Sequence, residues 1–400
     1  MRKLYIERFG PVKKAELELR DINLFIGEQS IGKSTLAKLI TILTDHLSLC
    51  KLTFLALSGW NEQLKAYNLD MYSKDDYLIH YEMEENEVKF FFDIRPKKLS
   101  SFMRKKGKRI TNKNAMVSEI VASKPFFHST TLYDYFSQEK NVKEKETTLS
   151  PLSFLSNSIY IPAERIIYSV ITNLLPAFTL VHSVVPLNLL RFMVDLENAK
   201  KEYSQLEMTL LNTSYIHEGT EDFFYVKEKG EKYPLSVASS GIQSTFPLLL
   251  VLHYAINNRE YSSFVIEEPE SNLFPQKQVE LLKHIIKKVK SEKRTLTITT
   301  HSPYLLSAMN NYLFAGTLVD RYGSQIRDSI SKILPEPYQL KPGDCSVYSL
   351  GEKTNGEGCY CKSLIDEETG MIDFNALDGE TIEMTAEFDQ LQEAFIQMKK

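Results

Sequence analysis

Apolar residues occur in two alternating patterns along the chain. Short runs at 22–26 and 264–266 are bounded by polar residues, as is typical of strands buried on both faces of a sheet. Segment 293–303 is predicted to be another buried strand, in which the run 295–299 is followed by a polar cluster. Segment 35–43 carries apolar residues at helical spacing, and 246–256 is a long apolar segment of helical length. Strands that alternate with helices in this way predict an α/β fold with a parallel central sheet.

Other segments predict structure that flanks this sheet. Runs 77–83 and 88–94 are strand-like and are joined by acidic turn residues, so we expect an antiparallel meander beside the core. Residues 166–215 are expected to be mostly helical, as a hairpin or bundle used for dimerisation or partner docking. Towards the C-terminus the pattern predicts short strands at 347–350 and 371–374 and a helix at 383–398.

Composition narrows the class of protein. The chain has 400 residues, of which 43% are hydrophobic and 25% charged, and its net charge is −4. These values exclude a disordered chain, a collagen-like chain and a polycation that coats nucleic acid. Four cysteines are too few for a disulfide framework, and the Cys359/Cys361 pair does not have zinc-ligand spacing, so we expect ordinary thiols.

The segment from Gly27 to Ser34, GEQSIGKS, has the spacing of a phosphate-binding loop between a strand and a helix. Backbone N–H groups of such a loop and the following helix N-terminus bind phosphate oxygens. Lys33 would bridge the β and γ phosphates of ATP, and the Ser34 hydroxyl would bind Mg²⁺. The residues expected to contact the nucleotide here are Gly27, Glu28, Gln29, Ser30, Ile31, Gly32, Lys33, Ser34 and Thr35.

Two carboxylates, Glu267 and Glu268, follow the apolar run 264–266. Ligands bind at the C-terminal ends of parallel strands. Glu267 is therefore a candidate Mg²⁺ ligand, and Glu268 a candidate base that polarises the attacking water. The alternative is that acidic residues merely end the strand.

Two further segments carry candidate polar groups. A turn with Ser239, Ser240, Gly241 and Gln243 opens the apolar segment 246–256, and its hydroxyls and N–H groups form a second candidate anion site. His301 follows the run 295–299, where it would reach a γ-phosphate and sense it.

The order of these motifs resembles an ABC-type ATPase head, in particular the bacterial OLD-like ATPases, which are also similar to SMC-type heads. The family's E-E-P-E strand and D-loop map to Glu268, Ser271 and Asn272, its signature turn to residues 239–243, and its switch histidine to His301. Segment 4–11 resembles the family's first strand, and 160–165 the strand that leads into its helical arm.

The resemblance implies a P-loop NTPase of ABC/SMC-head type, with a mixed core sheet, an antiparallel β-lobe and a helical arm insertion. It implies an ATPase that binds ATP and Mg²⁺ between two heads, as a homodimer or higher even oligomer. The phosphate loop of one head would face the signature turn of the other, and hydrolysis at Glu268 would release them. Such isologous interfaces favour twofold symmetry.

This sequence departs from the family in four respects. Ser30 and Ile31 replace a small pair that often contains glycine, so the loop is expected to be stiffer. The signature turn lacks the second glycine of transporter ATPases. No Q-loop glutamine is found, and Glu164 or Arg165 is the candidate replacement. The pattern of a TOPRIM nuclease does not follow His301, so we expect no nuclease activity in this chain.

These motifs divide the chain into four parts. Residues 1–165 form an N-terminal ATPase lobe with a β-rich, basic insertion at about 44–155. Residues 166–234 form the helical arm and a β-hairpin, 235–320 the C-terminal ATPase lobe, and 321–400 an acidic α+β extension.

Segment 166–190 contains no charged residue and is long enough to span a bilayer. A single span would separate the motifs of one nucleotide site, so we interpret the segment as buried or partner-facing, without a membrane. The N-terminus lacks an apolar signal core, which favours a cytoplasmic protein.

Charge is unevenly distributed. Segment Arg95–Lys113 holds nine basic residues and no acid, and it is either a contact for DNA or an acidic partner, or a solvated loop. Residues 366–393 hold ten acids and no base, and form either a complement to basic groups or a solubilising face.

We therefore predict a regulatory or sensor ATPase for a separate effector, a nuclease or toxin, in bacterial anti-phage defence. The alternative is an SMC- or RecF-like DNA-repair clamp. A transporter subunit is disfavoured by the altered signature turn and the missing Q-loop glutamine.

Overall fold

A six-stranded mixed sheet forms the centre of the computed structural model, which describes residues 2–85, 87–122, 157–171, 186–258, 261–351, 361–366 and 368–373. The strand order is β16-β15-β3-β14-β13-β8, and every neighbouring pair is parallel except β15 and β16. The predicted strands at 22–26 and 264–266 are confirmed, and the strand predicted over 293–303 is present but shorter, at 295–299. The strands are β3 (Ile22–Gly27), β8 (Ser158–Ile161), β13 (Ser263–Glu267), β14 (Thr295–Thr299), β15 (Cys345–Leu350) and β16 (Cys361–Ser363).

Both faces of this core sheet are covered, which explains its uninterrupted apolar strands. Phe25 and Val265 point to one face, where they share a hydrophobic cluster with helix α1 (Lys33–Thr44). Leu24 and Ile266 point to the other face and share a second cluster with three long helices. Burial of each such side chain stabilises the fold by roughly 2 kcal/mol. The three helices are α9 (Ser240–Asn257), α10 (Pro275–Ser291) and α11 (Pro303–Tyr322).

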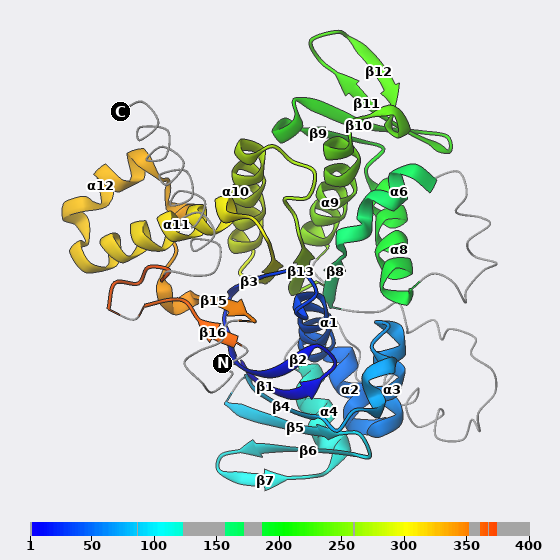
Figure 1. Ribbon diagram of the computed structural model, residues 1–400, viewed down its shortest axis with the longest axis vertical. Helices are drawn as coiled ribbons and strands as arrows, with labels where there is room; N and C mark the ends of the chain where they lie inside the picture. Colours follow the sequence, from blue (N-terminus) through cyan, green and yellow to red (C-terminus); the bar gives the residue numbers. More distant parts are fainter. Residues whose placement is uncertain are drawn as a thin grey trace, which may run out of the picture.

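A second six-stranded sheet packs over α1 and is antiparallel throughout, with the order β2-β1-β4-β5-β6-β7. It lies at the bottom of Figure 1. The predicted meander is confirmed by β4 and β5. The strands are β1 (Arg2–Phe9), β2 (Val12–Leu19), β4 (Leu78–Glu85), β5 (Val88–Arg95), β6 (Lys98–Lys105) and β7 (Lys108–Ile110).

The basic segment Arg95–Lys113 forms part of this antiparallel sheet. Strand β6 pairs along its length with β5, and β7 pairs with β6 to form a hairpin. The interpretation of this segment as a solvated loop is therefore wrong for its strands, because they pair within the sheet and the Met103 side chain is buried. Helices beside the sheet are α2 (His46–Leu55), α3 (Leu57–Ala66), η1 (Asp70–Lys74) and α4 (Lys113–Ala122).

The region between β8 and α9 is less helical than expected. Helix α8 (Leu187–Glu202) ends before residue 215, and a four-stranded antiparallel sheet follows it in place of a hairpin. This sheet lies at the top of Figure 1. The elements are η3 (Ala163–Arg165), α6 (Ile166–Ile171), β9 (Gln205–Met208), η5 (Thr209–Leu211), β10 (Thr213–Glu218), β11 (Glu221–Val226), β12 (Glu231–Pro234) and η6 (Leu235–Val237).

The C-terminal part contributes to the core sheet. The strand expected at 347–350 is β15, which pairs in parallel with β3 over its whole length, so part of the expected extension belongs to the ATPase sheet. Its helices are α12 (Ser324–Ile333), η7 (Glu336–Tyr338) and η8 (Pro342–Asp344). The predicted helix at 383–398, Cys359 and most of the acidic segment lie outside the described residues.

The structure describes segment 166–190 and the cysteines only in part. Among the described helices, none is long and apolar enough to cross a membrane. Much of segment 166–190 lies outside the described residues. The described cysteines, Cys50, Cys345 and Cys361, are buried thiols.

Candidate functional site

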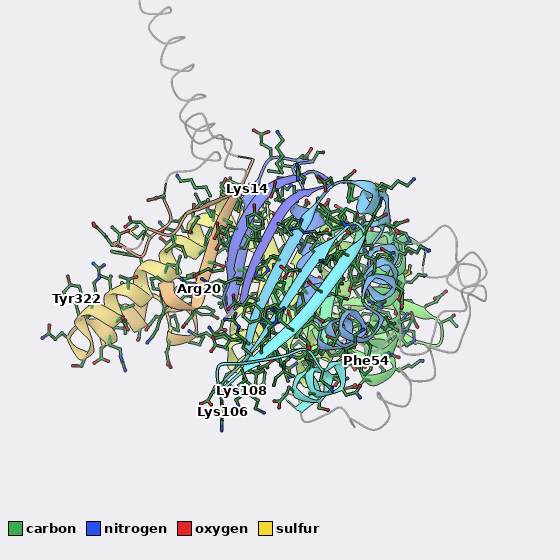
Figure 2. All side chains as sticks on the ribbon, turned by 90° about the horizontal axis from the view of Figure 1, so that it is seen from below. Lys14, Arg20, Phe54, Lys106, Lys108 and Tyr322 are labelled. Carbon is green, nitrogen blue, oxygen red and sulfur yellow. The ribbon has the colours of Figure 1, made fainter. Side chains whose placement is uncertain are left out.

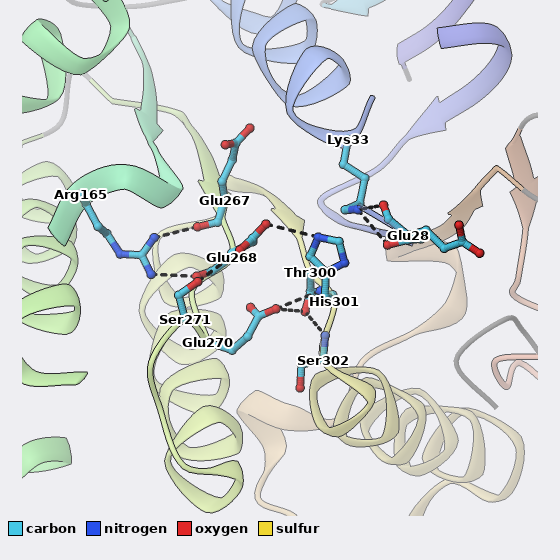
Figure 3. A network of polar contacts seen from close by, with 11 residues as sticks. Glu28, Lys33, Arg165, Glu267, Glu268, Glu270, Ser271, Thr300, His301 and Ser302 are labelled. Carbon is cyan, nitrogen blue, oxygen red and sulfur yellow. Dashed lines mark hydrogen bonds and ion pairs between the residues drawn. The ribbon is translucent and has the colours of Figure 1, made fainter. Parts of the chain in front are cut away.

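The polar motifs meet at one edge of the core sheet. Strands β3, β14, β13 and β8 are parallel neighbours, so their C-terminal ends lie side by side. Gly27 ends β3, Glu267 ends β13, and Thr300 follows β14 directly, with its N–H bonded to the carbonyl of Phe25. Figure 3 shows these segments together. This is the edge of an α/β sheet at which ligands bind.

The loop from Gly27 to Gly32 has a backbone that few residues adopt. Gly27 has φ 141°, and a Cβ there would lie 2.5 Å from the Ile31 side chain and 2.6 Å from the Leu350 carbonyl oxygen. Gly32 has φ 102° at the N-terminus of α1. Ser30 has φ 63°, a left-handed conformation that costs a non-glycine residue roughly 1 kcal/mol. The serine therefore adopts the backbone usual for the glycine it replaces.

Lys33 folds back onto its own loop. Its Nζ donates to the carbonyl oxygens of Gly27 at 2.8 Å and Glu28 at 2.5 Å. Burial lowers the pKa of Lys33 to about 8, and the charges of Glu268 and Glu267 oppose this shift. A phosphate bound in the loop would replace these two carbonyls as the partner of the ammonium group.

Glu267 lies in the interior beside Ser34 and Tyr160. Burial raises the pKa of Glu267 to about 7, and the charge of Lys38 and the hydroxyls of Tyr160 and Ser34 oppose the shift. Its Oε1 atom is buried and, within the described residues, accepts no hydrogen bond. An orphaned carboxylate oxygen next to a serine hydroxyl fits Mg²⁺, which usually takes one or two protein ligands and completes its shell with phosphate and water.

Glu268 is held in a strained turn next to His301. Its φ is 41°, and its N–H donates to the carbonyl of Thr299 at 2.9 Å. One carboxylate oxygen lies 3.3 Å from Nε2 of His301, and the other accepts from the Ser271 hydroxyl at 3.3 Å (Figure 3). The hydrogen bond from His301 is the main cause that lowers the pKa of Glu268, despite partial burial. The carboxylate is therefore ionised and half-exposed at the edge of the sheet.

The signature turn begins α9 and lies against the D-loop. Ser239 and Ser240 are exposed, whereas Gly241 is buried. A Cβ on Gly241 would lie 2.7 Å from the carbonyl oxygen of Asn272, so only glycine allows this contact. Gln243 turns inward, and its amide donates to the carbonyl oxygens of residues 235 and 236. We infer that Gln243 shapes the turn, while the two serines are available to a ligand.

The sequence pattern of the family described as AAA ATPase domain matches residues 1–178 and 187–306. The chain belongs to this family. The match includes the phosphate loop, both carboxylates, the signature turn and His301. This AAA ATPase has the predicted P-loop NTPase fold, with a mixed core sheet and an antiparallel sheet beside it. It is an enzyme that binds and hydrolyses ATP.

Solved structures share this arrangement at low sequence identity. The SMC head domain from Thermotoga maritima is 13% identical, and the match covers 76% of this chain and 90% of that one at a TM-score of 0.37. An Smc head bound to the C-terminal domain of ScpA, from Pyrococcus furiosus, is 12% identical, with coverage of 77% and 92% and a TM-score of 0.38.

The recombination mediator protein RecF with ATP is 13% identical, with coverage of 75% and 93% and a TM-score of 0.35. No curated protein matches this AAA ATPase in a comparison of sequences. At these identities and TM-scores, the likeness carries no conclusion on function.

Two buried residues of the ATPase site received no settled role from the sequence. Glu270 accepts hydrogen bonds from the Thr300 hydroxyl and from the His301 N–H at 3.0 Å, and so positions the histidine (Figure 3). Arg165, a candidate for the Q-loop position, is fully buried and directs its guanidinium at backbone carbonyls. It therefore has no donor left for a nucleotide, and the exposed Glu164 remains the candidate for that position.

Proposed function

We propose that this ATPase closes as a homodimer around ATP and Mg²⁺ and thereby regulates a separate effector, a nuclease or toxin, in cytoplasmic anti-phage defence. The observation that carries the dimer is the exposed surface around the signature turn. Ser239 and Ser240 face solvent, and Val237 and Phe274 beside them are 67% and 75% exposed. The contact between Gly241 and the D-loop brings these residues onto one surface.

Such a surface suits a second copy of the chain. Exposed apolar side chains beside a ligand site mark a protein interface. The N–H groups at the start of α9, an 18-residue helix, favour an anionic ligand, and the γ-phosphate of ATP bound to the partner head supplies one. A twofold axis would place the signature turn of each head against the phosphate loop of the other.

Each residue of the site then has a defined task. Lys33 exchanges the carbonyls of Gly27 and Glu28 for phosphate oxygens. Ser34 and Glu267 would hold Mg²⁺, which neutralises charge on the β and γ phosphates. Glu268 accepts a proton from the attacking water, and its ionised state at neutral pH suits this role. His301 would leave Glu268 to contact the γ-phosphate.

Support for a partner protein comes from exposed apolar side chains on helices α11 and α12. Helices α11 and α12 project from the body, and Tyr322 marks their end in Figure 2. Phe314, Tyr322 and Ile333 on these helices are 44%, 55% and 81% exposed. The effector assignment itself rests on the resemblance to OLD-like ATPases.

The dimer is tested with Glu268→Gln protein in ATP and Mg²⁺. Light scattering is expected to show twice the protomer mass with ATP and the protomer mass without it. Gly241→Glu in the same background should bind ATP and stay a monomer, because the side chain would enter the D-loop. An unchanged mass for Glu268→Gln with ATP would refute the dimer.

The effector is tested by purification of both variants from their native cells. A nuclease or toxin should be enriched with one variant over the other, and its activity should change when ATP is added. Equal recovery of every protein from both variants would contradict the regulatory role.

A second candidate function, DNA binding by a repair clamp, is favoured by the β6–β7 hairpin. The rings of Phe91 on β5 and Phe102 on β6 are stacked, with their centroids 4.6 Å apart, and the guanidinium of Arg109 lies 4.1 Å from the centroid of the Phe102 ring. Lys106 and Lys108 project from the hairpin tip (Figure 2). Basic groups interleaved with aromatic rings are typical of surfaces that bind single strands.

This second candidate is tested by replacing Lys106, Lys108 and Arg109 with neutral residues. Lys105 is left unchanged because it is paired with Glu119. For a DNA clamp, wild-type affinity for an oligonucleotide should fall steeply with salt, and the variant should lose both affinity and salt dependence. Equal binding by both proteins excludes the hairpin.

A further inference from the structure

Arg165 uses every donor it has on backbone carbonyls. It lies in η3, directly after β8, and its side chain is fully buried. An arginine carries five N–H groups in a rigid plane. These groups donate to the carbonyl oxygens of Pro162 at 3.0 Å, Ser244 at 3.1 Å, Glu267 at 2.8 Å, Glu268 at 2.8 Å and Pro269 at 3.3 Å.

Three of these carbonyls surround the strained residue of the site. Glu268 has φ 41°, a left-handed conformation that is unfavourable for a non-glycine residue, so the turn needs outside support. Arg165 binds the carbonyls of Glu267 and Glu268 (Figure 3). It also binds the carbonyl of Pro269, so its contacts lie before, at and after the strained residue. The guanidinium thus clamps the turn that aims the carboxylate of Glu268.

The same segment also holds the start of the signature helix. Pro247 inside α9 has no N–H, so the carbonyl of Gln243 lacks its helical partner. The Ser169 hydroxyl, four residues after Arg165, donates to that carbonyl at 2.8 Å. Arg165 donates to the next carbonyl, that of Ser244. The continuous segment of η3 and α6 therefore contacts both the Glu268 turn and the signature helix.

We propose that Arg165 is a positioning residue for ATP hydrolysis, which sets the aim of Glu268 and couples it to the signature helix through α6. A shift of about 1 Å in a reacting group lowers the rate by about 100-fold, whereas nucleotide affinity depends on the phosphate loop. Loss of Arg165 should therefore lower kcat and leave ATP binding intact. This inference rests on the proposed role of Glu268.

The chain offers a matched control in Arg294. Its guanidinium also binds backbone carbonyls at one end of α9, namely those of Ala255, Ile256, Asn258 and Tyr261. These residues lie at the end of α9 opposite the signature turn. Arg294→Ala removes the same chemistry from a place that does not touch Glu268.

The test compares Arg165→Ala, Arg165→Lys and Arg294→Ala in kcat, KM and affinity for ATP. We expect kcat to fall about 100-fold in Arg165→Ala and about 10-fold or more in Arg165→Lys, which has three donors without the planar fork. ATP affinity should stay within about threefold in both. Methylguanidine in the buffer should restore part of kcat to Arg165→Ala and should leave kcat of the other two variants unchanged.

Three outcomes decide the matter. Wild-type kcat in Arg165→Lys and Arg165→Ala overturns the proposal, and so does an equal loss of kcat in Arg294→Ala. Should Arg165→Ala fail to fold, the kcat loss of Arg165→Lys at unchanged ATP affinity decides. Glu268→Gln is measured in parallel: wild-type turnover there refutes the role of Glu268, whereas an inactive Glu268→Gln beside an active Arg165→Ala refutes only the clamp.

Discussion

The Nε2 atom of His301 lies 3.3 Å from a carboxylate oxygen of Glu268. The sequence assigned these two residues separate tasks on the nucleotide, and the structure brings them into direct contact. The histidine keeps the carboxylate ionised and oriented before ATP arrives, because its hydrogen bond is the largest influence that lowers the pKa of Glu268. A γ-phosphate would compete with Glu268 for the same imidazole, so the pair can report whether ATP is present.

Glu268→Gln is expected to bind ATP normally and to lose turnover by about 100-fold or more, because an amide cannot accept the proton of the attacking water. Phosphate release at saturating ATP measures turnover, and calorimetry measures binding. Glu270→Gln serves as the comparison, since Glu270 acts on His301 rather than on water. Wild-type-like hydrolysis by Glu268→Gln would remove the residue from the mechanism.

His301→Ala is expected to shift the acidic limb of kcat/KM to higher pH. The wild-type pKa of Glu268 is held below its usual value chiefly by His301, so the carboxylate stays ionised at lower pH in the wild type than in the variant. Ser271→Ala, which removes a weaker influence, should shift the limb in the same direction by less. An acidic limb that stays in place would show that Glu268 does not govern it.

ATP affinity is expected to fall as the pH rises above about 8. Burial sets the pKa of nucleotide-free Lys33 to about 8, opposed by the facing charges of Glu268, Glu267, Glu270 and Glu28. The charged ammonium binds phosphate, so above that pH binding must first protonate Lys33, at up to about tenfold in Kd per pH unit. Lys33→Arg should give a flat profile, and Lys33→Ala should abolish binding. A flat wild-type profile would contradict the burial of Lys33.

Glu267→Gln is expected to stabilise the nucleotide-free protein at pH 8. The folded pKa of Glu267, about 7, lies above its usual value of 4.5, so the folded state favours the protonated form. The contribution of Glu267 to stability is full below pH 4.5 and is lost as pH rises through 7. Removing the charge should therefore add about 3 kcal/mol at pH 8 and little at pH 4.5.

Urea unfolding of wild type and Glu267→Gln at the two pH values measures this difference. Wild type should regain stability with ATP and Mg²⁺ at pH 8, whereas Glu267→Gln should regain less. If Glu267→Gln were less stable than wild type at pH 8, this would contradict the raised pKa that burial gives Glu267 in the folded state.

Local sequence patterns predicted most of the site, but they could not predict contacts between distant segments. Strand β3, the loop and helix α1 follow each other directly, so the run 22–26, the glycines and the helical spacing predicted the phosphate-binding element. Glu267 and His301 were predicted in the same way, because each follows an apolar strand of the same parallel sheet.

Three features depend on contacts between distant segments. The pattern at 347–350 indicates a strand but does not identify β3 as its neighbour. In the sequence, Arg165 is a charged residue that follows a strand. Nothing in the neighbouring residues indicates that it binds carbonyls about 80 and 100 residues away. Glu270 likewise meets His301 only because β13 and β14 are adjacent.

Strand β3 ends in the phosphate-binding loop, yet both of its neighbours, β14 and β15, come from the last third of the chain. The loop itself needs Leu350, whose carbonyl lies against Gly27. During synthesis on the ribosome, the first strands therefore emerge long before their partners. We expect the nascent polypeptide to form this loop only after residue 350 has left the exit tunnel, so that shorter nascent chains do not hold ATP.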